Sequence, residues 1–517
     1  MDIIIVLDFG GQYTHLITRR IRDLGVYSEI LPFDVDIEIL KNKSPRAIIL
    51  SGGPGSVYEK DDPKLSLEFY QFTSKYKIPV LGICYGHHLI MHQMGGRVES
   101  KEKKEYGKAI LTILKPTLLF ESLEKDQLVW MSHGDQIIEV AKGFEVYANT
   151  ETCPVAAYGN QETKLYGVQF HPEVSNTPNG NIILENFIFK IAKSKKEWKL
   201  EGWIDKTIEE LRKEIGPDKI VILGLSGGVD SSVTAGLLHK AIGDRLHCIF
   251  VNNGVLRKNE ELEVQETFKQ RFQNFHYVDA EELFLERLAN IDDPEEKRRI
   301  IGYTFIEVFE TKTIELERMY PDIKYLAQGT IYPDRVETSA TSKVSAKIKS
   351  HHNLTLPDDM KLEIIEPLRD LYKDEVRRVG LKIGIPKNII HRHPFPGPGL
   401  AVRIIGPIDK EKLTILRNAD EILIEEIKNA GIYDQIWQAF CVFLPLKTVG
   451  IMGDFRTYEY ICSIRIVESN DAMTANFSKL DWDLLERIGT RIANEVKGIN
   501  RVVYDISNKP PSTIEYE

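Results

Sequence analysis

Cysteine is scarce in this 517-residue chain, and the few that occur are scattered. The five cysteines are odd in number, and no two of them form a C-x-x-C pattern. Small secreted scaffolds and zinc modules both rely on grouped cysteines, so the sequence supports neither a disulfide framework nor a zinc site. We therefore expect a reducing, cytoplasmic environment. The five are Cys84, Cys153, Cys248, Cys441 and Cys462.

Long apolar runs and an excess of positive charge are also missing. No apolar stretch approaches the roughly 20 residues that cross a bilayer. The segment Met1–Asp8 has an acidic second residue and a five-residue apolar run, which favours a first β-strand over a signal peptide. The formal net charge of −10 disfavours nucleic-acid binding that is mainly electrostatic. We expect neither a membrane nor a nucleic acid as partner.

What is present is the composition of a large globular protein. Hydrophobic residues make up 42% and charged residues 28% of the chain, whose length suits about three domains. Short apolar strands alternate with helical segments in the first two thirds, which predicts α/β domains with open, mostly parallel sheets. We divide the chain into an α/β domain over 1–192, a lysine-dense linker over 193–203, an α/β domain over 204–392 and a smaller α+β domain over 393–517.

The stretch Gly224–Ser232 is the most informative in the second domain. Its sequence G-L-S-G-G-V-D-S-S lies between the apolar strand Ile220–Leu223 and the start of a helix. Backbone amides, serine hydroxyls and the positive helix end then face one point, which suits a phosphate group. The spacing of the common mononucleotide P-loop is absent, and no lysine follows the glycines. An ordinary turn is the alternative, which the flanking strand and helix disfavour.

This stretch resembles the SGG-x-DSS loop of the ATP pyrophosphatases. The resemblance implies ATP as co-substrate and Mg²⁺ held by Asp230, because a hard cation prefers carboxylate and phosphate oxygens. One departure is Asn252, where relatives often carry aspartate. A zinc site at His351 and His352 is an alternative that lacks further ligands. The implied ATP-binding residues are Ser226, Gly227, Gly228, Val229, Asp230, Ser231, Ser232, Gly329 and Lys349.

Three motifs of the first domain predict acyl-transfer chemistry. Cys84 lies between small residues in G-I-C-Y-G after an apolar strand, as in a nucleophile elbow, where a helix N-terminus favours the thiolate. His171 and Glu173 follow another strand and provide a base with a carboxylate to orient its ring. The glycine-rich turn 51–56 offers amides for an oxyanion. Taken alone, the cysteine fits a buried structural residue and the histidine a surface one.

G-I-C-x-G, S-G-G-P and H-P-E in this order resemble a class I glutamine amidotransferase domain. The resemblance implies that Cys84 is the nucleophile, His171 the general base and Glu173 its orienting carboxylate, with Gly53 and Tyr85 forming the oxyanion hole. Many relatives carry glutamine at the position of His88. The motifs S-H-G-D at 132–135 and E-Y-G at 105–107 also resemble this domain in its nucleotide-making members.

The last domain begins with the proline-rich H-P-F-P-G-P-G-L at 393–400, which predicts a fixed loop. An α-β-β-α-β order follows and suggests a KH-like module. The G-x-x-G at 450–453 lies between two predicted strands rather than two helices, which disfavours RNA binding.

With G-D-x-R-T-Y at 453–458 and K-P-P-S-T-I-E at 509–515, nearly the whole chain resembles the family of glutamine-hydrolysing GMP synthases. The resemblance implies amination of XMP to GMP through an adenyl-XMP intermediate, the last step of de novo guanine nucleotide synthesis, with ammonia from glutamine and ATP converted to AMP and pyrophosphate. It also implies a homodimer through the C-terminal domain. An RNA-modifying enzyme and a binding protein with inactive sites remain alternatives. The implied XMP contacts are Lys509, Ile514, Glu515, Arg456 and Arg298.

Overall fold

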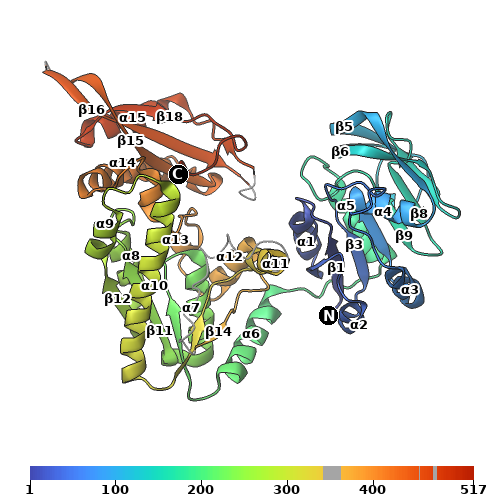
Figure 1. Ribbon diagram of the computed structural model, residues 1–517, viewed down its shortest axis with the longest axis horizontal. Helices are drawn as coiled ribbons and strands as arrows, with labels where there is room; N and C mark the ends of the chain where they lie inside the picture. Colours follow the sequence, from blue (N-terminus) through green and yellow to red (C-terminus); the bar gives the residue numbers. More distant parts are fainter. Residues whose placement is uncertain (342–361, 453–454, 470–473) are drawn as a thin grey trace. The chain divides into compact units, whose positions relative to one another are not determined.

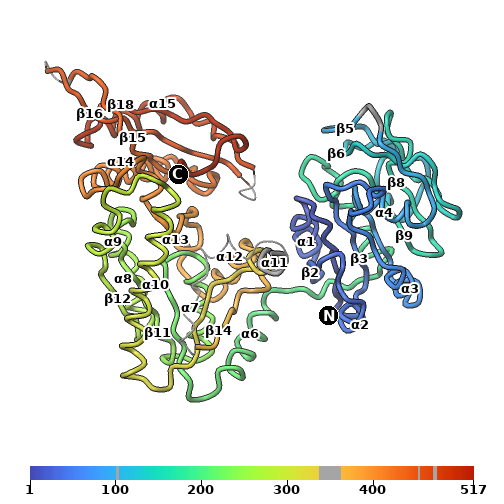
Figure 2. The backbone as a smooth tube through the Cα atoms, viewed as in Figure 1, coloured from blue at the N-terminus to red at the C-terminus, as the bar shows by residue number. Residues whose placement is uncertain are grey.

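The computed structural model describes residues 1–341, 362–452, 455–469 and 474–517 (Figure 1, Figure 2). These divide into two compact units, Met1–Lys199 and Leu200–Glu517. The predicted fold class is confirmed, since both units contain a parallel α/β sheet and the second adds a separate sheet near its carboxyl end. Lys349, His351 and His352 lie outside the described residues.

The first unit is built on a nine-stranded sheet of order β2-β1-β3-β4-β9-β8-β7-β5-β6. The strands from β2 to β9 in this order run parallel, and the remaining four pair antiparallel. Strands β3, β4 and β9 are wholly buried, because helices cover a parallel sheet on both faces. The strands are β1 (Ile3–Asp8), β2 (Tyr27–Pro32), β3 (Ala47–Leu50), β4 (Val80–Ile83), β5 (Arg97–Ile113), β6 (Asp126–Glu139), β7 (Glu145–Asn149), β8 (Ala157–Asn160) and β9 (Leu165–Val168).

Side-chain caps start two of the helices of this unit. Asp36 accepts from the Glu38 amide before α2, and Ser66 accepts from the Phe69 amide before α3, each satisfying an N–H that the helix itself leaves unpaired. The helices are α1 (Thr14–Asp23), α2 (Ile37–Lys43), α3 (Leu67–Tyr76), α4 (Tyr85–Gln93) and α5 (Gly180–Glu185), with the short helical segments η1 (Leu118–Phe120) and η2 (Asn186–Ile191).

The second unit begins with a fully parallel five-stranded sheet of order β12-β11-β10-β13-β14. The chain moves outward from β10 in one direction and then returns to its other side, so the order reverses next to β10. Open α/β sheets bind ligands at such a point, beyond the carboxyl ends of the strands. The strands are β10 (Ile220–Gly224), β11 (Leu246–Asn252), β12 (Asn274–Asp279), β13 (Ile323–Ala327) and β14 (Glu363–Ile365).

Helices surround this sheet, and none in the described part of the chain is long and apolar enough to cross a membrane. Asp293 and Pro294 start the long α10 in the usual way, with a carboxylate cap and proline in the first turn. Helix α6 begins at Leu200, within the predicted linker 193–203. The helical segments are α6 (Leu200–Ile215), α7 (Val229–Ile242), η3 (Gly243–Arg245), α8 (Glu260–Lys269), α9 (Glu281–Leu288), α10 (Pro294–Met319), α11 (Tyr332–Thr341), α12 (Lys373–Lys382), α13 (Lys387–Ile390) and η4 (Gly399–Arg403).

The end of the chain forms a second sheet in which β16 lies between β15 and β18. Helices α14 and α15 pack on it, and one apolar core runs from the parallel sheet through α14 into this sheet. Strands β15 and β16 form a long hairpin whose far end extends past these helices (Figure 1). The elements are α14 (Lys410–Asn429), η5 (Tyr433–Gln435), β15 (Gln438–Met452), β16 (Phe455–Glu468), β17 (Asn476–Phe477), α15 (Trp482–Glu495) and β18 (Ile499–Tyr504).

Candidate active sites

Cys84 occupies a strained turn between β4 and α4. Its φ of 53° and ψ of −101° lie in a region that non-glycine residues rarely adopt, and strain of this kind is typical of nucleophile elbows. The turn depends on its two glycines. A Cβ on Gly82 would lie 2.3 Å from the Gly86 carbonyl oxygen, and a Cβ on Gly86 would lie 2.6 Å from the Leu50 Cβ. The G-x-C-x-G pattern is therefore a steric requirement of this turn.

His171 and Glu173 form a buried pair just beyond β9. The His171 Nδ1 lies 2.7 Å from the Glu173 Oε1, and the His171 side chain is also hydrogen-bonded to Cys84. Thr177 donates to the His171 carbonyl at 2.7 Å, and the Tyr13 ring packs edge-on against the imidazole. The structure thus brings the three predicted catalytic residues together in one chain of contacts.

The pKa of His171 is raised to about 10. Burial acts to lower it, but the charge of Glu173 and the hydrogen bonds to Cys84 and Glu173 outweigh burial. The ring is therefore an imidazolium at neutral pH, hydrogen-bonded to the Cys84 side chain.

The glycine-rich turn after β3 packs directly against His171 and Cys84. A Cβ on Gly52 would lie 3.3 Å from the His171 Cε1 and 3.6 Å from the Cys84 Cβ, and a Cβ on Gly53 would lie 2.6 Å from the Phe9 carbonyl oxygen. Tyr85 is the first residue of α4, so its amide belongs to the turn whose N–H groups find no acceptor within the helix. The predicted oxyanion-hole residues therefore flank the nucleophile.

The surroundings of the sulfur include a residue that the sequence motifs missed. Gln169 Nε2 lies 3.9 Å from the Cys84 Sγ, which itself lies 3.6 Å from the Ser132 carbonyl oxygen. Gln169 is two residues before His171, and that closeness to H-P-E was its only signal. His88 is also buried here, and burial, followed by repulsion from His133, lowers its pKa to about 4, so its ring is neutral.

Serine hydroxyl groups form hydrogen bonds within the loop between β10 and α7. Ser226 and Ser231 share a hydrogen bond of 3.0 Å, the Gly228 amide donates to the Ser226 Oγ at 3.3 Å, and Ser232 donates to the Gly228 carbonyl at 2.6 Å. Gly227 has a φ of +74°, and a Cβ there would lie 2.7 Å from a Val264 methyl group. The loop lies at the point where the strand order reverses.

Asp230 presents one bonded and one unbonded oxygen at this loop. Its Oδ2 lies 2.5 Å from the Lys373 Nζ on α12, while its buried Oδ1 has no hydrogen-bond partner within the described residues. Gly329 packs on the same turn, because a Cβ there would lie 3.3 Å from the Asp230 Cβ. Lys373 was missed by sequence reasoning, since a lysine in the first turn of a helix carries no motif.

The Asn252 side chain closes the turn after β11. Its Nδ2 donates to the Asp279 carboxylate at 3.1 Å, and its Oδ1 accepts from the Gly254 amide.

The carboxyl-terminal tail is held by buried cations. Arg403 donates to both oxygens of Glu515, at 3.0 and 2.9 Å, and Gln438 donates to one of them at 2.6 Å. The fully buried Lys297 binds the Glu517 carboxylate and the Ile404 carbonyl.

The implied XMP contacts fall into two groups. Arg298 binds the Glu517 carbonyl, and Ile514 is buried beside β15, so both lie with Glu515 at the tail. The backbone of Lys509 forms an isolated antiparallel β-bridge with Ala475, next to the end of β16. Arg456 is exposed at the beginning of that strand, opposite Ile451. The structure therefore does not bring Arg456 to the tail.

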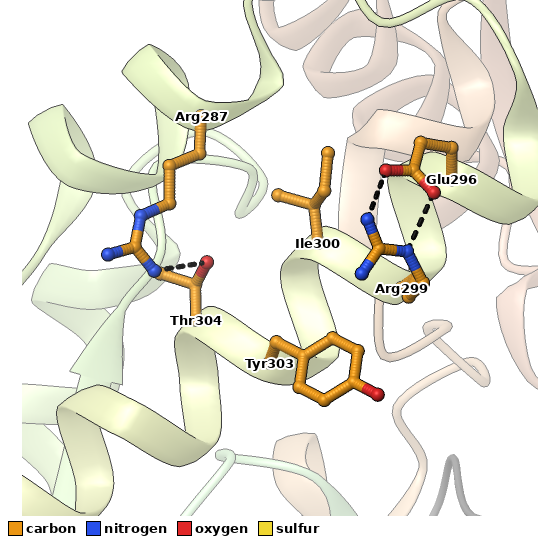
Figure 3. Close-up of a pocket in the computed structure, with 6 residues that line it drawn as sticks. All are labelled: Arg287, Glu296, Arg299, Ile300, Tyr303 and Thr304. Carbon is orange, nitrogen blue, oxygen red and sulfur yellow. Dashed lines mark hydrogen bonds and ion pairs between the residues drawn. The ribbon is translucent and has the colours of Figure 1, made fainter.

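A separate pocket is lined by α10 together with Arg287 of α9 (Figure 3). Its two arginines are already paired, Arg287 with Glu307 and Thr304 and Arg299 with Glu296. No predicted site residue lines it. The lining residues are Arg287, Glu296, Arg299, Ile300, Tyr303 and Thr304.

Comparisons with known proteins agree with this organisation. Family models match over residues 5–191 (glutamine amidotransferase class-I), 200–296 (NAD synthase) and 425–516 (GMP synthase C terminal domain). Three relatives named GMP synthase [glutamine-hydrolyzing] align along the chain. The protein from Brachyspira hyodysenteriae is 53% identical over 100% of this chain and 99% of its own length. Those from Aquifex aeolicus and Thermosipho melanesiensis are 52% identical, over 99% of both chains and 100% of both chains.

The fold and the two sites define a class I glutamine amidotransferase joined to an ATP pyrophosphatase. With such identity over its whole length, the chain belongs to the family of glutamine-hydrolysing GMP synthases.

Glu173→Gln tests the buried pair. Without the carboxylate, two of the causes that raise the pKa of His171 are removed, so its pKa falls and the ring loses the partner that orients it. We expect glutamine hydrolysis, measured as glutamate release, to fall by roughly 10²- to 10⁴-fold. Glu121→Gln, which alters an exposed pair with Lys190 in the same unit, serves as control. A Glu173→Gln rate close to that of the parent would contradict the arrangement.

Lys373→Met tests the phosphate loop. The change removes the cation beside Asp230, and we expect pyrophosphate release from ATP to fall by roughly 10²- to 10³-fold while glutamine hydrolysis persists. Lys382→Met on the same helix removes only an exposed pair with Glu201 and is the matched control. Equal rates for the two variants would show that Lys373 does not act at the loop.

Proposed function

We propose that this protein aminates XMP to GMP, using ATP and the ammonia released from glutamine. The observation that carries the proposal is the pairing, in one chain, of a buried Cys84–His171–Glu173 arrangement with a serine-rich phosphate loop at a sheet's reversal point. The identity to GMP synthases along the whole chain supports the same reaction.

The chemistry explains why both sites are needed. The C2 oxygen of xanthine is a poor leaving group, so it first attacks the α-phosphorus of ATP and pyrophosphate departs. Ammonia then adds at C2 of the adenyl-XMP, AMP leaves, and the added nitrogen gives up its extra protons. Free ammonia is mostly protonated at neutral pH, which favours producing it within the enzyme, shielded from water.

In the first site, we propose that the Cys84 thiolate attacks the glutamine amide carbon while the Gly53 and Tyr85 amides bind the developing oxyanion. His171 transfers a proton to the departing ammonia and then takes one from the water that hydrolyses the thioester to glutamate. Glu173 keeps the ring oriented throughout.

In the second site, we propose that the loop 226–232, Gly329 and Lys349 hold the phosphates of ATP. The unbonded Oδ1 of Asp230 fits a magnesium ion, which prefers hard oxygen ligands and supplies charge neutralisation to the phosphates when bound. For XMP we propose Lys509, Ile514, Glu515 and Arg298 at the tail, and Arg456 from the hairpin.

The protein's wider organisation is proposed on similar grounds. We place the functional domains at 1–192, 204–392 and 393–517, with a linker over 193–203. The scattered cysteines, odd in number and without a C-x-x-C pattern, fit a reducing cytoplasm, and the acidic net charge fits small-molecule substrates rather than nucleic acid. Against an RNA-thiolating enzyme stands Cys248, the cysteine closest in sequence to the loop, which is buried in β11 with its pKa raised by burial.

GMP formation with Cys84→Ala tests the proposed reaction directly. The parent should release pyrophosphate from ATP and Mg²⁺ only with XMP present, and should form GMP from glutamine or from ammonium. Cys84→Ala should form GMP from ammonium alone, because only the thiol is missing. A parent that releases no XMP-dependent pyrophosphate with either nitrogen source would refute the proposal.

We further propose a homodimer through the hairpin of β15 and β16. Large apolar side chains are exposed along it, with Ile451 and Phe455 each 79% exposed, and such a surface is typical of a subunit interface. Ile451→Asp should shift the protein from dimer to monomer in analytical ultracentrifugation. Leu67→Asp, at a site 72% exposed in the other unit, should not. A parent protein that sediments as a monomer would refute the dimer.

A further inference from the structure

A second buried histidine–carboxylate pair lies beside the glutaminase residues and has no role in the steps above. His133 Nε2 lies 3.1 Å from the Glu105 Oε2, and His133 Nδ1 lies 2.9 Å from the Asp135 carbonyl oxygen. The His133 side chain is 2% exposed and that of Glu105 15%. A backbone carbonyl only accepts hydrogen bonds, so Nδ1 carries a proton and Nε2 faces the carboxylate.

Glu105 is held as a carboxylate. Burial acts to raise the pKa of Glu105, but hydrogen bonds from His133, Thr152 and Thr150 outweigh it, and the net shift is downward. The His133 ring lies between this carboxylate and the Asp135 carbonyl oxygen, which fixes its orientation.

The pair lies where the backbone pairing of β5 and β6 is interrupted. The register shifts between Ser100, which pairs with Asp135, and Glu105, which pairs with His133, so the ladder is irregular beside Gly134. The side-chain contact between Glu105 and His133 reinforces the first backbone pair after this irregularity.

The segment Ser132–Asp135 touches the glutaminase site at two places. The Ser132 carbonyl lies 3.6 Å from the Cys84 Sγ. The Asp135 carboxylate accepts from Ser56 Oγ at 2.6 Å and from Tyr58 OH at 2.9 Å, which ties it to the glycine-rich turn that contains Gly53. A shift of this segment would move both the surroundings of the nucleophile and the oxyanion donors.

We propose that the Glu105–His133 pair is a positioning element for glutamine hydrolysis, holding Ser132–Asp135 against the Cys84 sulfur and the glycine-rich turn. The proposal rests on the glutamine-hydrolysing function proposed above. Cys153 also lies close, with ligand atoms of the three residues within 4.8 Å of one another, as a zinc site requires. The positioning role is favoured because Glu105 already accepts from His133 and from Thr150 at 3.1 Å.

Glu105→Gln tests the pair because it keeps the size of the side chain and removes its charge. With glutamine as nitrogen source, kcat should fall roughly 10- to 100-fold while KM for glutamine changes little, since misplacement affects the transition state more than binding. With ammonium, GMP formation should remain within about twofold of the parent rate. His133→Gln should give the same split, and Glu145→Gln, which alters an exposed pair with Lys115, should match the parent.

Three results would overturn the proposal. The first is an unchanged kcat with glutamine in both variants, and the second is an equal loss with glutamine and ammonium, which indicates general damage. The third is about one zinc per chain in the parent, measured by elemental analysis and absent from Glu105→Gln, which would assign a metal site instead. If the parent forms no GMP, the proposed function fails, and glutamate release from glutamine still compares the variants.

Discussion

A sharp turn from the carboxyl end of a buried parallel strand into the first turn of a helix is the constraint on which both active sites depend. At Cys84 the turn forces a positive φ on a residue that carries a side chain, and Gly82 and Gly86 make room for it. At Gly227 the strained position is given to glycine itself. In both places a positive φ lies between a strand and a helix N-terminus, on a residue with a side chain at Cys84 and on glycine at Gly227.

Buried charged side chains fix the position of the carboxyl-terminal tail. Lys297, Arg403 and Arg465 are fully buried, and each is paired with carboxylates or several carbonyl oxygens. Breaking a buried pair is costly because the remaining charge stays in a poorly solvating interior. The tail that carries Ile514 and Glu515 therefore has a defined position, although its sequence is short, polar and rich in proline. In the first unit, the Glu105–His133 contact lies at an irregularity in the pairing of two strands.

The sequence predicted what is encoded locally. The elbow at Cys84, the loop at Gly227 and the H-P-E segment are contiguous patterns, in which glycine and proline mark the backbone geometry, and the alternation of strands and helices indicated the α/β class. Lys373 and Arg403 were missed because each acts on a residue more than 100 positions away and lies in an ordinary helix or helical turn. Glu105 lies in the E-Y-G motif, but its contact with His133, 28 positions away, was not predicted. Helix α6 starts at Leu200, within the predicted linker 193–203, because the lysine-rich segment before it masked the apolar spacing.

The distribution of apolar cores has a consequence for how such a gene can be rearranged. The core of the first unit draws its members from residues between Ile5 and Leu165, whereas a single core joins Ile222 of the parallel sheet to Ile499 of the last strand. A division of the reading frame between Lys199 and Leu200 would cut through neither core, so the ammonia-producing half can evolve as an independent polypeptide. A division within the second half would expose apolar surface on both products, and natural selection should keep that half intact.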